Sequence, residues 1–361
     1  MAKLTLQQRL HRDNIEEKVK SFPSYIEEYK DDMYSGNCSP STLWGYLSDF
    51  EKFFNWLMAE GLSDAESLKE VSLSTLEKLR LKEVDSYFSH LKTREELNEK
   101  TINRKKSSLK SLFKFLTERT EDDNGECYFY RNVMAKVKIS KPKESLSSRA
   151  EIIGNNIYHD EDMYNFLSFI DKDYEHKLLS NNSKQQYRYF KRDKERDIAI
   201  MALLIFSGLR VSELANLTLA NLNLQQAKMK VLRKGSNDEI VHFLPEAIPY
   251  IQDYLSIRTE RYRAPSDEEF VFLTLYQGVA KPISIRALQN LVYKYTLAFK
   301  GDKLSPHKLR HTFATEYAKS NGLYDLMRQL GHTSTEVSSL YVNSSDKEAQ
   351  AAINRMRRQS D

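Results

Sequence analysis

Residues 133–150 interrupt a sequence that is otherwise rich in helical patterns. Pro, Ser and Lys replace the regular spacing of apolar residues there, and this composition is typical of a linker. A chain of 361 residues is also long for a single hydrophobic core. We therefore expect an N-terminal domain over residues 1–132, a basic linker over 133–150 and a C-terminal domain over 151–361.

The N-terminal part carries the pattern of successive amphipathic helices. Ser39 is a suitable N-cap, Pro40 suits the first helical position, and Gly61 ends the run of apolar residues that follows. Similar periodicity predicts helices around 74–91 and 98–119. This domain is expected to be helical throughout.

The C-terminal part adds a small amount of sheet to further helices. Alternating residues at 228–234 and 239–245 flank a turn and predict a β-hairpin. An apolar helix is expected over 197–208, after a polar segment at 180–194 that is typical of an irregular loop. Helices are also expected over 246–263, over 285–300 and from 305 onward, so the predicted fold class is mainly α with a small β-sheet.

Basic residues gather in one N-terminal helix, although the whole chain has a net charge of only +4. Lys106, Lys110 and Lys114 recur every four residues and form one stripe, which suits a phosphate backbone. An ordinary amphipathic surface helix would show the same stripe. The candidate DNA-binding residues are Arg104, Lys105, Lys106, Lys110, Lys114 and, in the linker, Lys141.

A second group of polar residues has the chemistry needed to attack a phosphodiester. Arginine offers a planar fork of donors to phosphate oxygens, histidine moves protons near neutral pH, and tyrosine can be a covalent nucleophile. Zinc is not expected at His307 and His311, because Lys308 stands where the HExxH pattern needs glutamate. The group comprises Arg210, His307, Arg310, His311, His332 and Tyr341.

These residues lie in motifs that resemble those of the tyrosine recombinases, or phage integrase family. The motifs are Gly208-Leu209-Arg210-x-Ser212-Glu213-Leu214, His307-x-Leu309-Arg310-His311, Leu330-Gly331-His332 and, nine residues later, Tyr341. The resemblance implies an N-terminal helical core-binding (SAM-like) domain and a C-terminal catalytic domain, which together form a C-shaped clamp on DNA.

The resemblance also implies a role for each residue. Tyr341 would be the nucleophile that forms a 3′-phosphotyrosyl intermediate. Arg210 and Arg310 would hold the phosphate. Glu213 lies one helical turn after Arg210 and would orient either that arginine or a neighbouring histidine. His307 would be the general base or proton shuttle, and His332 would donate a hydrogen bond to the phosphate.

Two assignments in this set have alternatives. The leaving group would be protonated by Lys234 of the hairpin, with Arg233 and Lys230 as alternatives. His311, one turn beyond His307, is either a member of the set or a buried structural histidine, and the second is expected.

The implied function is site-specific recombination, in which double-stranded DNA is cut and rejoined through a Holliday junction without a cofactor. A homotetramer would hold two synapsed sites, and the C-terminal segment 347–358, with one apolar face, would dock in a neighbouring subunit. The layout resembles the single-recombinase type of Xer protein. Chromosome-dimer resolution at cell division, activated by a septal DNA translocase (FtsK-like), is therefore expected.

Three other functions remain as alternatives. They are an integrase or transposase of a mobile element, a type IB topoisomerase and a catalytically inactive DNA-binding regulator. The target DNA sequence leaves no readable signature.

The remaining composition favours a cytoplasmic protein. The sequence contains no apolar run of the ~20 residues that span a membrane, and its start lacks the apolar core of a signal peptide. Cys38 and Cys127 stand far apart without metal-ligand spacing, which predicts neither a disulfide framework nor a metal site.

Overall fold

The computed structural model describes residues 5–140, 158, 161–180, 183–233, 238–332 and 335–342. The chain divides into two compact units, Met1–Lys143 and Glu144–Asp361. Each has a hydrophobic core of its own. Within the described ranges, no helix is long and apolar enough to cross a membrane.

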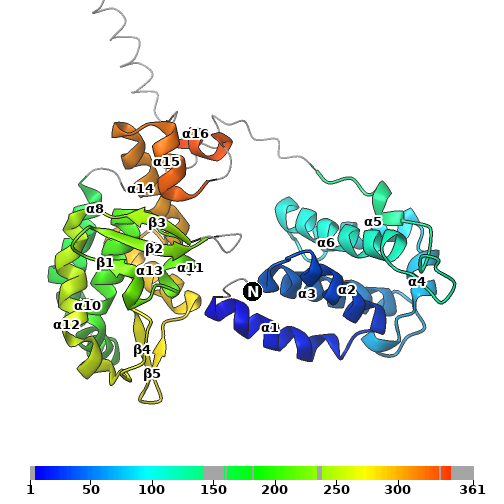
Figure 1. Cartoon of the computed structure of the whole chain (residues 1–361), viewed down its shortest axis with the longest axis horizontal. Coiled ribbons are helices and arrows are strands. Elements are labelled where there is room, and N and C mark those ends of the chain that lie inside the picture. Colours follow the sequence, from blue (N-terminus) through cyan, green and yellow to red (C-terminus); the bar gives the residue numbers. More distant parts are fainter. Residues whose placement is uncertain are drawn as a thin grey trace, which may run out of the picture. The chain divides into compact units, whose positions relative to one another are not determined.

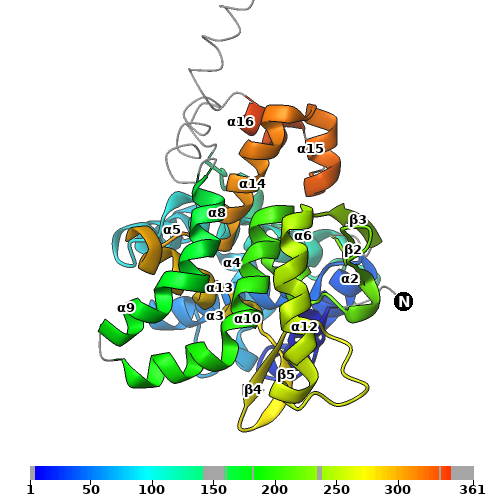
Figure 2. The ribbon, with the colours of Figure 1, turned by 90° about the vertical axis from the view of Figure 1, so that its left-hand side faces the viewer.

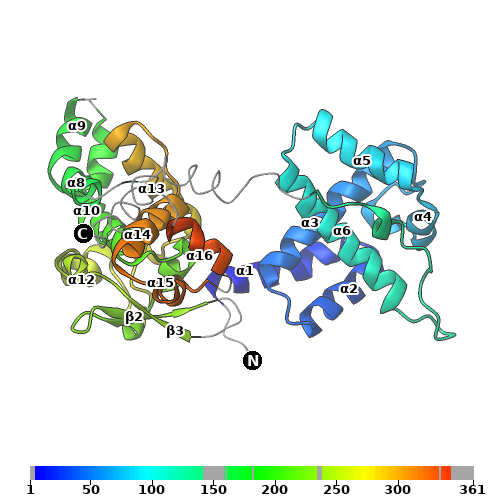
Figure 3. The ribbon, with the colours of Figure 1, turned by 90° about the horizontal axis from the view of Figure 1, so that it is seen from above.

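The N-terminal unit is built from helices around an aromatic core (Figures 1 and 3). Phe50, Phe53 and Phe54 of one helix and Phe113 of another are fully buried in this core. Short 3₁₀ turns lie at Leu68–Glu70 and Val133–Lys136. The helices are α1 (Leu6–Val19), α2 (Ser24–Ser35), α3 (Pro40–Ala59), α4 (Leu73–Lys78), α5 (Leu81–Thr93) and α6 (Glu99–Glu118).

Helix α3 begins and ends as its sequence predicts. The Ser39 side chain accepts a hydrogen bond from the backbone N–H of Thr42, and Pro40 takes the first helical position. Gly61, with φ +66°, lies just beyond the end of the helix. The helix predicted over 98–119 is confirmed as α6.

The single helix predicted around 74–91 is wrong, because two helices meet at Leu79 and Arg80. Leu79 has an extended backbone (φ −56°, ψ 130°), and Arg80 is the N-cap of α5. The Glu83 carboxylate accepts from the Arg80 backbone N–H at 2.8 Å and so stabilises the new helix start. Apolar spacing continues across the break, which hides it from a periodicity argument.

A buried carboxylate joins α3 to α6. Asp49, 1% exposed, accepts two hydrogen bonds from the Arg104 guanidinium (2.5 and 2.8 Å) and one from the Lys105 ammonium (2.7 Å). Ser108 donates to the same carboxylate at 3.0 Å. A buried carboxylate needs such donors, because it has lost its water.

The N-terminal core extends beyond the predicted domain boundary at residue 132. Val133, Met134 and Val137 are buried in it, so the first residues of the predicted linker belong to the folded unit. The linker residues 141–150 lie outside the described residues.

The C-terminal unit places its sheets among helices (Figure 2). Helices α10 and α12 lie side by side, and α14, α15 and α16 pack together. Its elements are α8 (Asp162–Ser168), α9 (Tyr174–Ser180), α10 (Lys184–Ser207), α11 (Val211–Ala215), β1 (Leu222–Asn223), β2 (Lys228–Leu232), β3 (Asp238–His242), α12 (Ile248–Tyr262), β4 (Leu273–Tyr276), β5 (Val279–Pro282), α13 (Ile285–Lys300), α14 (Pro306–Ser320), α15 (Leu323–Leu330) and α16 (Thr335–Val342).

The predicted hairpin is confirmed as β2 and β3, which form an antiparallel sheet in the order β1-β2-β3. Met229 faces Val241, and both side chains are buried in the core. A second hairpin, β4 and β5, was not predicted.

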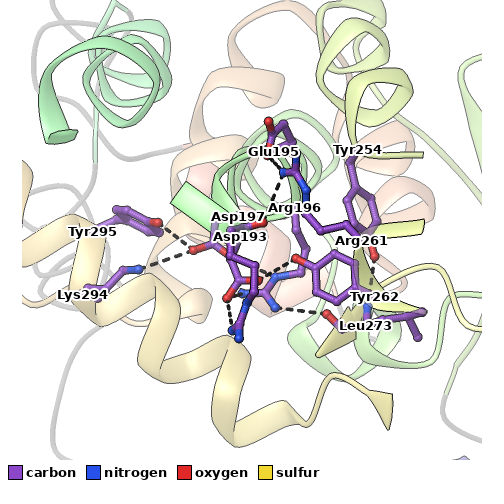
Figure 4. Close-up of polar contacts among 11 residues, drawn as sticks. Asp193, Glu195, Arg196, Asp197, Tyr254, Arg261, Tyr262, Leu273, Lys294 and Tyr295 are labelled. Atoms are coloured by element: carbon purple, nitrogen blue, oxygen red, sulfur yellow. Dashed lines mark hydrogen bonds and ion pairs between the residues drawn. The ribbon is translucent and has the colours of Figure 1, made fainter. Parts of the chain in front are cut away.

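The loop predicted at 180–194 is wrong, because α10 begins at Lys184 and runs through this polar segment. Its polar residues have partners on other elements (Figure 4). Tyr262 of α12 donates to Asp193 at 2.7 Å, and Tyr295 of α13 donates to Asp197 at 2.7 Å. Arg196 is 4% exposed and pairs with Asp197. The polar side chains of this part of α10 are therefore buried through hydrogen bonds and ion pairs, and not through apolar contacts.

We predict that Asp49→Asn strongly destabilises the N-terminal unit. Asp49→Asn removes the counter-charge of the buried Lys105 ammonium, and breaking a buried pair in this way costs about 3–5 kcal/mol of unfolding free energy. Both tryptophans, Trp44 and Trp56, lie on α3, so fluorescence during denaturant unfolding follows this unit.

Glu51→Gln is the matched control for this substitution. Glu51 pairs with Lys18 at 2.5 Å, but its side chain is 43% exposed, so we expect a loss of less than about 1 kcal/mol. Equal effects of the two substitutions would contradict a stabilising role for the buried pair.

Candidate active site

A turn after α10 positions the first arginine of the candidate site. Gly208 has φ +66°, and a Cβ atom there would overlap the Phe313 ring, so the turn requires glycine. Arg210 is the N-cap of α11, and the Glu213 carboxylate accepts from its backbone N–H (2.9 Å) and its Nη1 (2.8 Å). Nη2 of Arg210 donates to the Gly331 carbonyl at 3.1 Å.

Arg310 of α14 is a buried cation, 2% exposed, that is held by carbonyl oxygens. Its Nη1 donates to the Gly208 carbonyl at 2.6 Å, and its Nη2 donates to the Leu330 carbonyl. Among the described residues, no carboxylate lies within ion-pair distance of it. Burial, together with the nearby charge of Arg210, lowers the pKa of Arg310 to about 10.

The turn end of the β2–β3 hairpin contributes a third arginine, directly after β2. Arg233 is 6% exposed, and its Nη1 donates to Glu239 (2.6 Å) and to the Arg328 carbonyl (3.1 Å). Its Nη2 donates to the Gln329 carbonyl at 2.7 Å. The Glu213 carboxylate lies 3.4 Å from its Nε. These contacts occupy both terminal nitrogens of Arg233 and make it a structural anchor.

The last carbonyls of α15 therefore receive donors from three arginines. Arg233 donates to the carbonyls of residues 328 and 329, Arg310 donates to that of residue 330, and Arg210 donates to that of residue 331. The C-terminus of a helix carries partial negative charge and unpaired carbonyls, which suits cations. This end of α15 holds the three arginines together.

His332 follows directly and lies beside Arg310. Its Nε2 is 3.3 Å from Nη2 of Arg310, and its Nδ1 is 2.9 Å from the Ser338 hydroxyl. Arginine can only donate, so Nε2 accepts and the ring hydrogen lies on Nδ1. Burial and the charge of Arg310 lower the pKa of His332 to about 4, and the ring is neutral at pH 7.

Tyr341 of α16 is buried, 2% exposed, next to α14. Its hydroxyl lies 2.5 Å from Nδ1 of His311. Burial raises the pKa of Tyr341 to about 12, and burial together with His307 lowers that of His311 to about 3. The phenol therefore donates to a neutral imidazole.

The sequence did not predict this role for His311. A structural histidine was expected, but its ring contacts the candidate nucleophile. His307, the predicted general base, is exposed, and its ring meets that of His311 edge-on with 4.2 Å between centroids. The four-residue spacing of the two histidines on one helix was a signal that they would be neighbours.

Lys234, the predicted acid for the leaving group, lies outside the described residues. Lys230, the other alternative, forms a 2.8 Å ion pair with Asp238 on the surface of the hairpin. The described residues contain no group of three or more His, Cys, Asp or Glu side chains that could hold a metal ion.

The predicted DNA-binding residues of α6 differ in their surroundings. Lys105 is buried against Asp49, which removes it from the set that could touch DNA. Arg104 pairs with the same carboxylate but keeps half of its side chain exposed.

The stripe itself is accessible on the helix surface. Lys106 donates to the Lys138 carbonyl at 3.0 Å, Lys110 is half-buried, and Lys114 is exposed. Lys141 lies outside the described residues.

Family models match both units. The model described as "Phage integrase family" matches residues 168–348, and "Phage integrase, N-terminal SAM-like domain" matches residues 26–120.

Curated relatives match almost the whole chain. Tyrosine recombinase XerS of Lactococcus lactis subsp. cremoris (strain MG1363) is 41% identical over 350 residues, which cover 94% of this chain and 97% of the relative. Tyrosine recombinase XerS of Streptococcus uberis is 39% identical and covers 97% of this chain and 100% of the relative.

Solved structures of DNA complexes share the fold. XerH recombinase bound to difH substrate has a TM-score of 0.59 at 20% identity, covering 91% of this chain and 84% of that one. The Tn1549 transposon integrase with transposon right end DNA has a TM-score of 0.55 at 19% identity, covering 92% and 99%.

The arginine arrangement predicts that Gly331→Ala disrupts the site. Gly331 has φ +62°, and a Cβ atom there would overlap the Arg233 guanidinium. The left-handed backbone should cost alanine about 1–2 kcal/mol of unfolding free energy. The overlap with Arg233 should cost about 1–3 kcal/mol more. Thermal unfolding, followed by circular dichroism, measures the loss.

Gly278→Ala is the control, because Gly278 has φ +78° and no atom within 4 Å of the added Cβ. This variant should lose only the unfolding free energy that a left-handed alanine costs, and it should leave the arginines in place. If the two variants lose the same stability, the packing of Arg233 against Gly331 does not constrain the turn.

Proposed function

Because the chain belongs to the phage integrase family, the tyrosine recombinases, we propose that Tyr341 cuts DNA and holds the cut end. The chain is a site-specific recombinase that transfers DNA strands. One observation carries the assignment of the nucleophile. The Tyr341 hydroxyl bonds to a histidine, and its ring lies over that of His332, which contacts the buried Arg310.

The arginines supply the charge that phosphoryl transfer needs. Both guanidinium groups of Arg310 and Arg210 donate to neutral carbonyls, Arg210 through Nη2 only, and a phosphate oxygen is a stronger acceptor than a carbonyl. Their fixed positions let them stabilise the charge that builds on the phosphate oxygens in the transition state. His332 would donate to the phosphate once Nε2 carries a hydrogen.

Cleavage then exchanges one ester for another. The Tyr341 oxygen bonds to phosphorus, the bond to the 5′-oxygen breaks, and a 3′-phosphotyrosyl link remains. Lys234 would protonate the departing 5′-oxygen. Arg233, the residue directly before it, is anchored to the Gln329 carbonyl of α15. The link keeps the energy of the broken bond, so rejoining needs no cofactor.

The biological role that we propose is resolution of chromosome dimers in the cytoplasm at cell division. It is supported by relatives named Xer that match over nearly the full length at 41% and 39% identity. The protein would act as a homotetramer on two sites through a Holliday junction, with a septal DNA translocase as activator. The exchanged C-terminal segment would be 347–358, which lies outside the described residues.

A mobile-element integrase is the second candidate. The similarity to the Tn1549 transposon integrase, at 19% identity, concerns the fold alone. The target site that the protein cuts distinguishes the two roles.

The nucleophile is tested with nicked duplexes that carry candidate inverted repeats from the replication terminus and from beside the gene. The natural protein should form an adduct that survives denaturation, and Tyr341→Phe should form none, because phenylalanine has no oxygen. A denaturing gel measures the adduct.

Tyr324→Phe is the matched control, because Tyr324 is 78% exposed on α15. It should form the adduct at the normal rate. An adduct with Tyr341→Phe would show that another residue attacks, and trapping only beside the gene would favour the mobile-element role.

The lysine stripe predicts a salt effect on DNA binding. Lys110→Ala or Lys114→Ala should weaken binding and lower the slope of log affinity against log salt by about 1 each, since each removes one phosphate contact. Lys78→Ala, an exposed lysine on α4, is the control. Unchanged slopes in the stripe variants would contradict a role for this face of α6 in DNA binding.

A further inference from the structure

Three aromatic side chains link the buried nucleophile to the protein surface. The Tyr341 hydroxyl is 2.5 Å from Nδ1 of His311, and the His311 ring contacts the His307 ring with 4.2 Å between centroids. Tyr341 is buried, His311 half-buried and His307 exposed. The series leads from the reacting oxygen to solvent.

We propose that His311 takes the proton from Tyr341 during cleavage and that His307 carries this proton onward to solvent. The inference rests on the proposed function, in which Tyr341 is the nucleophile. It makes His311 a catalytic residue, because His311 contacts the reacting atom, and it leaves His307 as a shuttle only.

The position of the hydrogens fits this direction of transfer. Neutral imidazole has one donor and one acceptor nitrogen, and Nδ1 of His311 accepts from the tyrosine, so its hydrogen lies on Nε2. The distance between Nδ1 and the phenol oxygen is that of a hydrogen bond already made, so transfer needs no side-chain movement.

The charges around His311 make its basicity depend on the substrate. Burial lowers its pKa most, and His307, Lys308 and Arg310 on α14 and His332 after α15 lower it further, to about 3. The surrounding protein therefore opposes an imidazolium. A scissile phosphate brings negative charge to the same arginines and histidines, which offsets the part of this penalty that comes from their charges. Proton transfer is thereby tied to the presence of a phosphate.

In the cleavage step, the bond from the Tyr341 oxygen to phosphorus forms and the bond from phosphorus to the 5′-oxygen breaks. The phenol proton moves to Nδ1 of His311. The 5′-oxygen receives a proton from the acid of the hairpin. The imidazolium of His311 releases its Nε2 hydrogen toward His307, and rejoining runs the same path in reverse.

The test measures single-turnover adduct formation on a nicked duplex by the full-length protein. Asparagine at position 311 can still accept a hydrogen bond near the place of Nδ1 but cannot take a proton. We expect His311→Asn and His311→Ala each to slow adduct formation by at least about a hundredfold, the usual lower range for general acid–base catalysis. Binding to DNA and thermal unfolding are measured in parallel, and His176→Asn, an exposed histidine of α9, is the control.

A second substrate distinguishes the base from the acid. Sulfur in place of the bridging 5′-oxygen gives a leaving group that needs no proton. The His311→Asn defect should persist on this substrate, because it concerns the nucleophile. The His307→Asn variant should form the adduct more slowly than the natural protein but faster than the His311→Asn variant. The reason is that solvent can replace an exposed proton shuttle.

Three results would overturn the inference. They are a normal rate for His311→Asn, recovery of its rate on the sulfur substrate, and a His307→Asn rate below that of His311→Asn. Failure of the proposed function has a separate signature, since the natural protein would then form no adduct that Tyr341→Phe abolishes. A fold defect in His311→Ala leaves the decision to the asparagine variant.

Discussion

The end of helix α15 is the feature on which the rest of the C-terminal unit depends. Four successive carbonyls, those of residues 328–331, receive hydrogen bonds from Arg233, Arg310 and Arg210. Three cations at one place repel one another, and two of them are almost fully buried. The helix end supplies partial negative charge and orphan carbonyls, and Glu213 supplies one full negative charge to Arg210 and Arg233.

This arrangement brings together groups that are far apart in the sequence. Gly208 and Gly331 both have positive φ, and each ends a helix close to the Arg310 guanidinium. The chain then continues from the first into Arg210 and from the second into His332. Because an added Cβ atom at either glycine would overlap a neighbouring side chain, the groups that we propose to bind phosphate are held in place by close packing.

Sequence reasoning finds residues whose chemical type is unusual in its setting, and it misses those whose role comes from packing. The α3 cap and the β2–β3 hairpin follow local rules, so they were predicted. The polar part of α10 was missed because its side chains form hydrogen bonds and ion pairs with distant residues, such as the hydrogen bond between Tyr262 and Asp193. The contacts of His311 and Arg233 could not be predicted for the same reason, since their partners are a tyrosine thirty residues later and carbonyls of a distant helix.

Burial, and after it the charge of neighbouring groups, acts in the same direction on Arg310, His332 and His311. Together they lower the pKa of Arg310 to about 10, that of His332 to about 4 and that of His311 to about 3. Each of these groups is therefore less stable in its charged form than it would be in water. In the proposed mechanism, a phosphate diester would offset the part of this penalty that comes from neighbouring charges, so part of its binding energy would help to charge His311, the proton acceptor for Tyr341. Binding of the substrate and activation of the proposed nucleophile would then both depend on the charge of the phosphate.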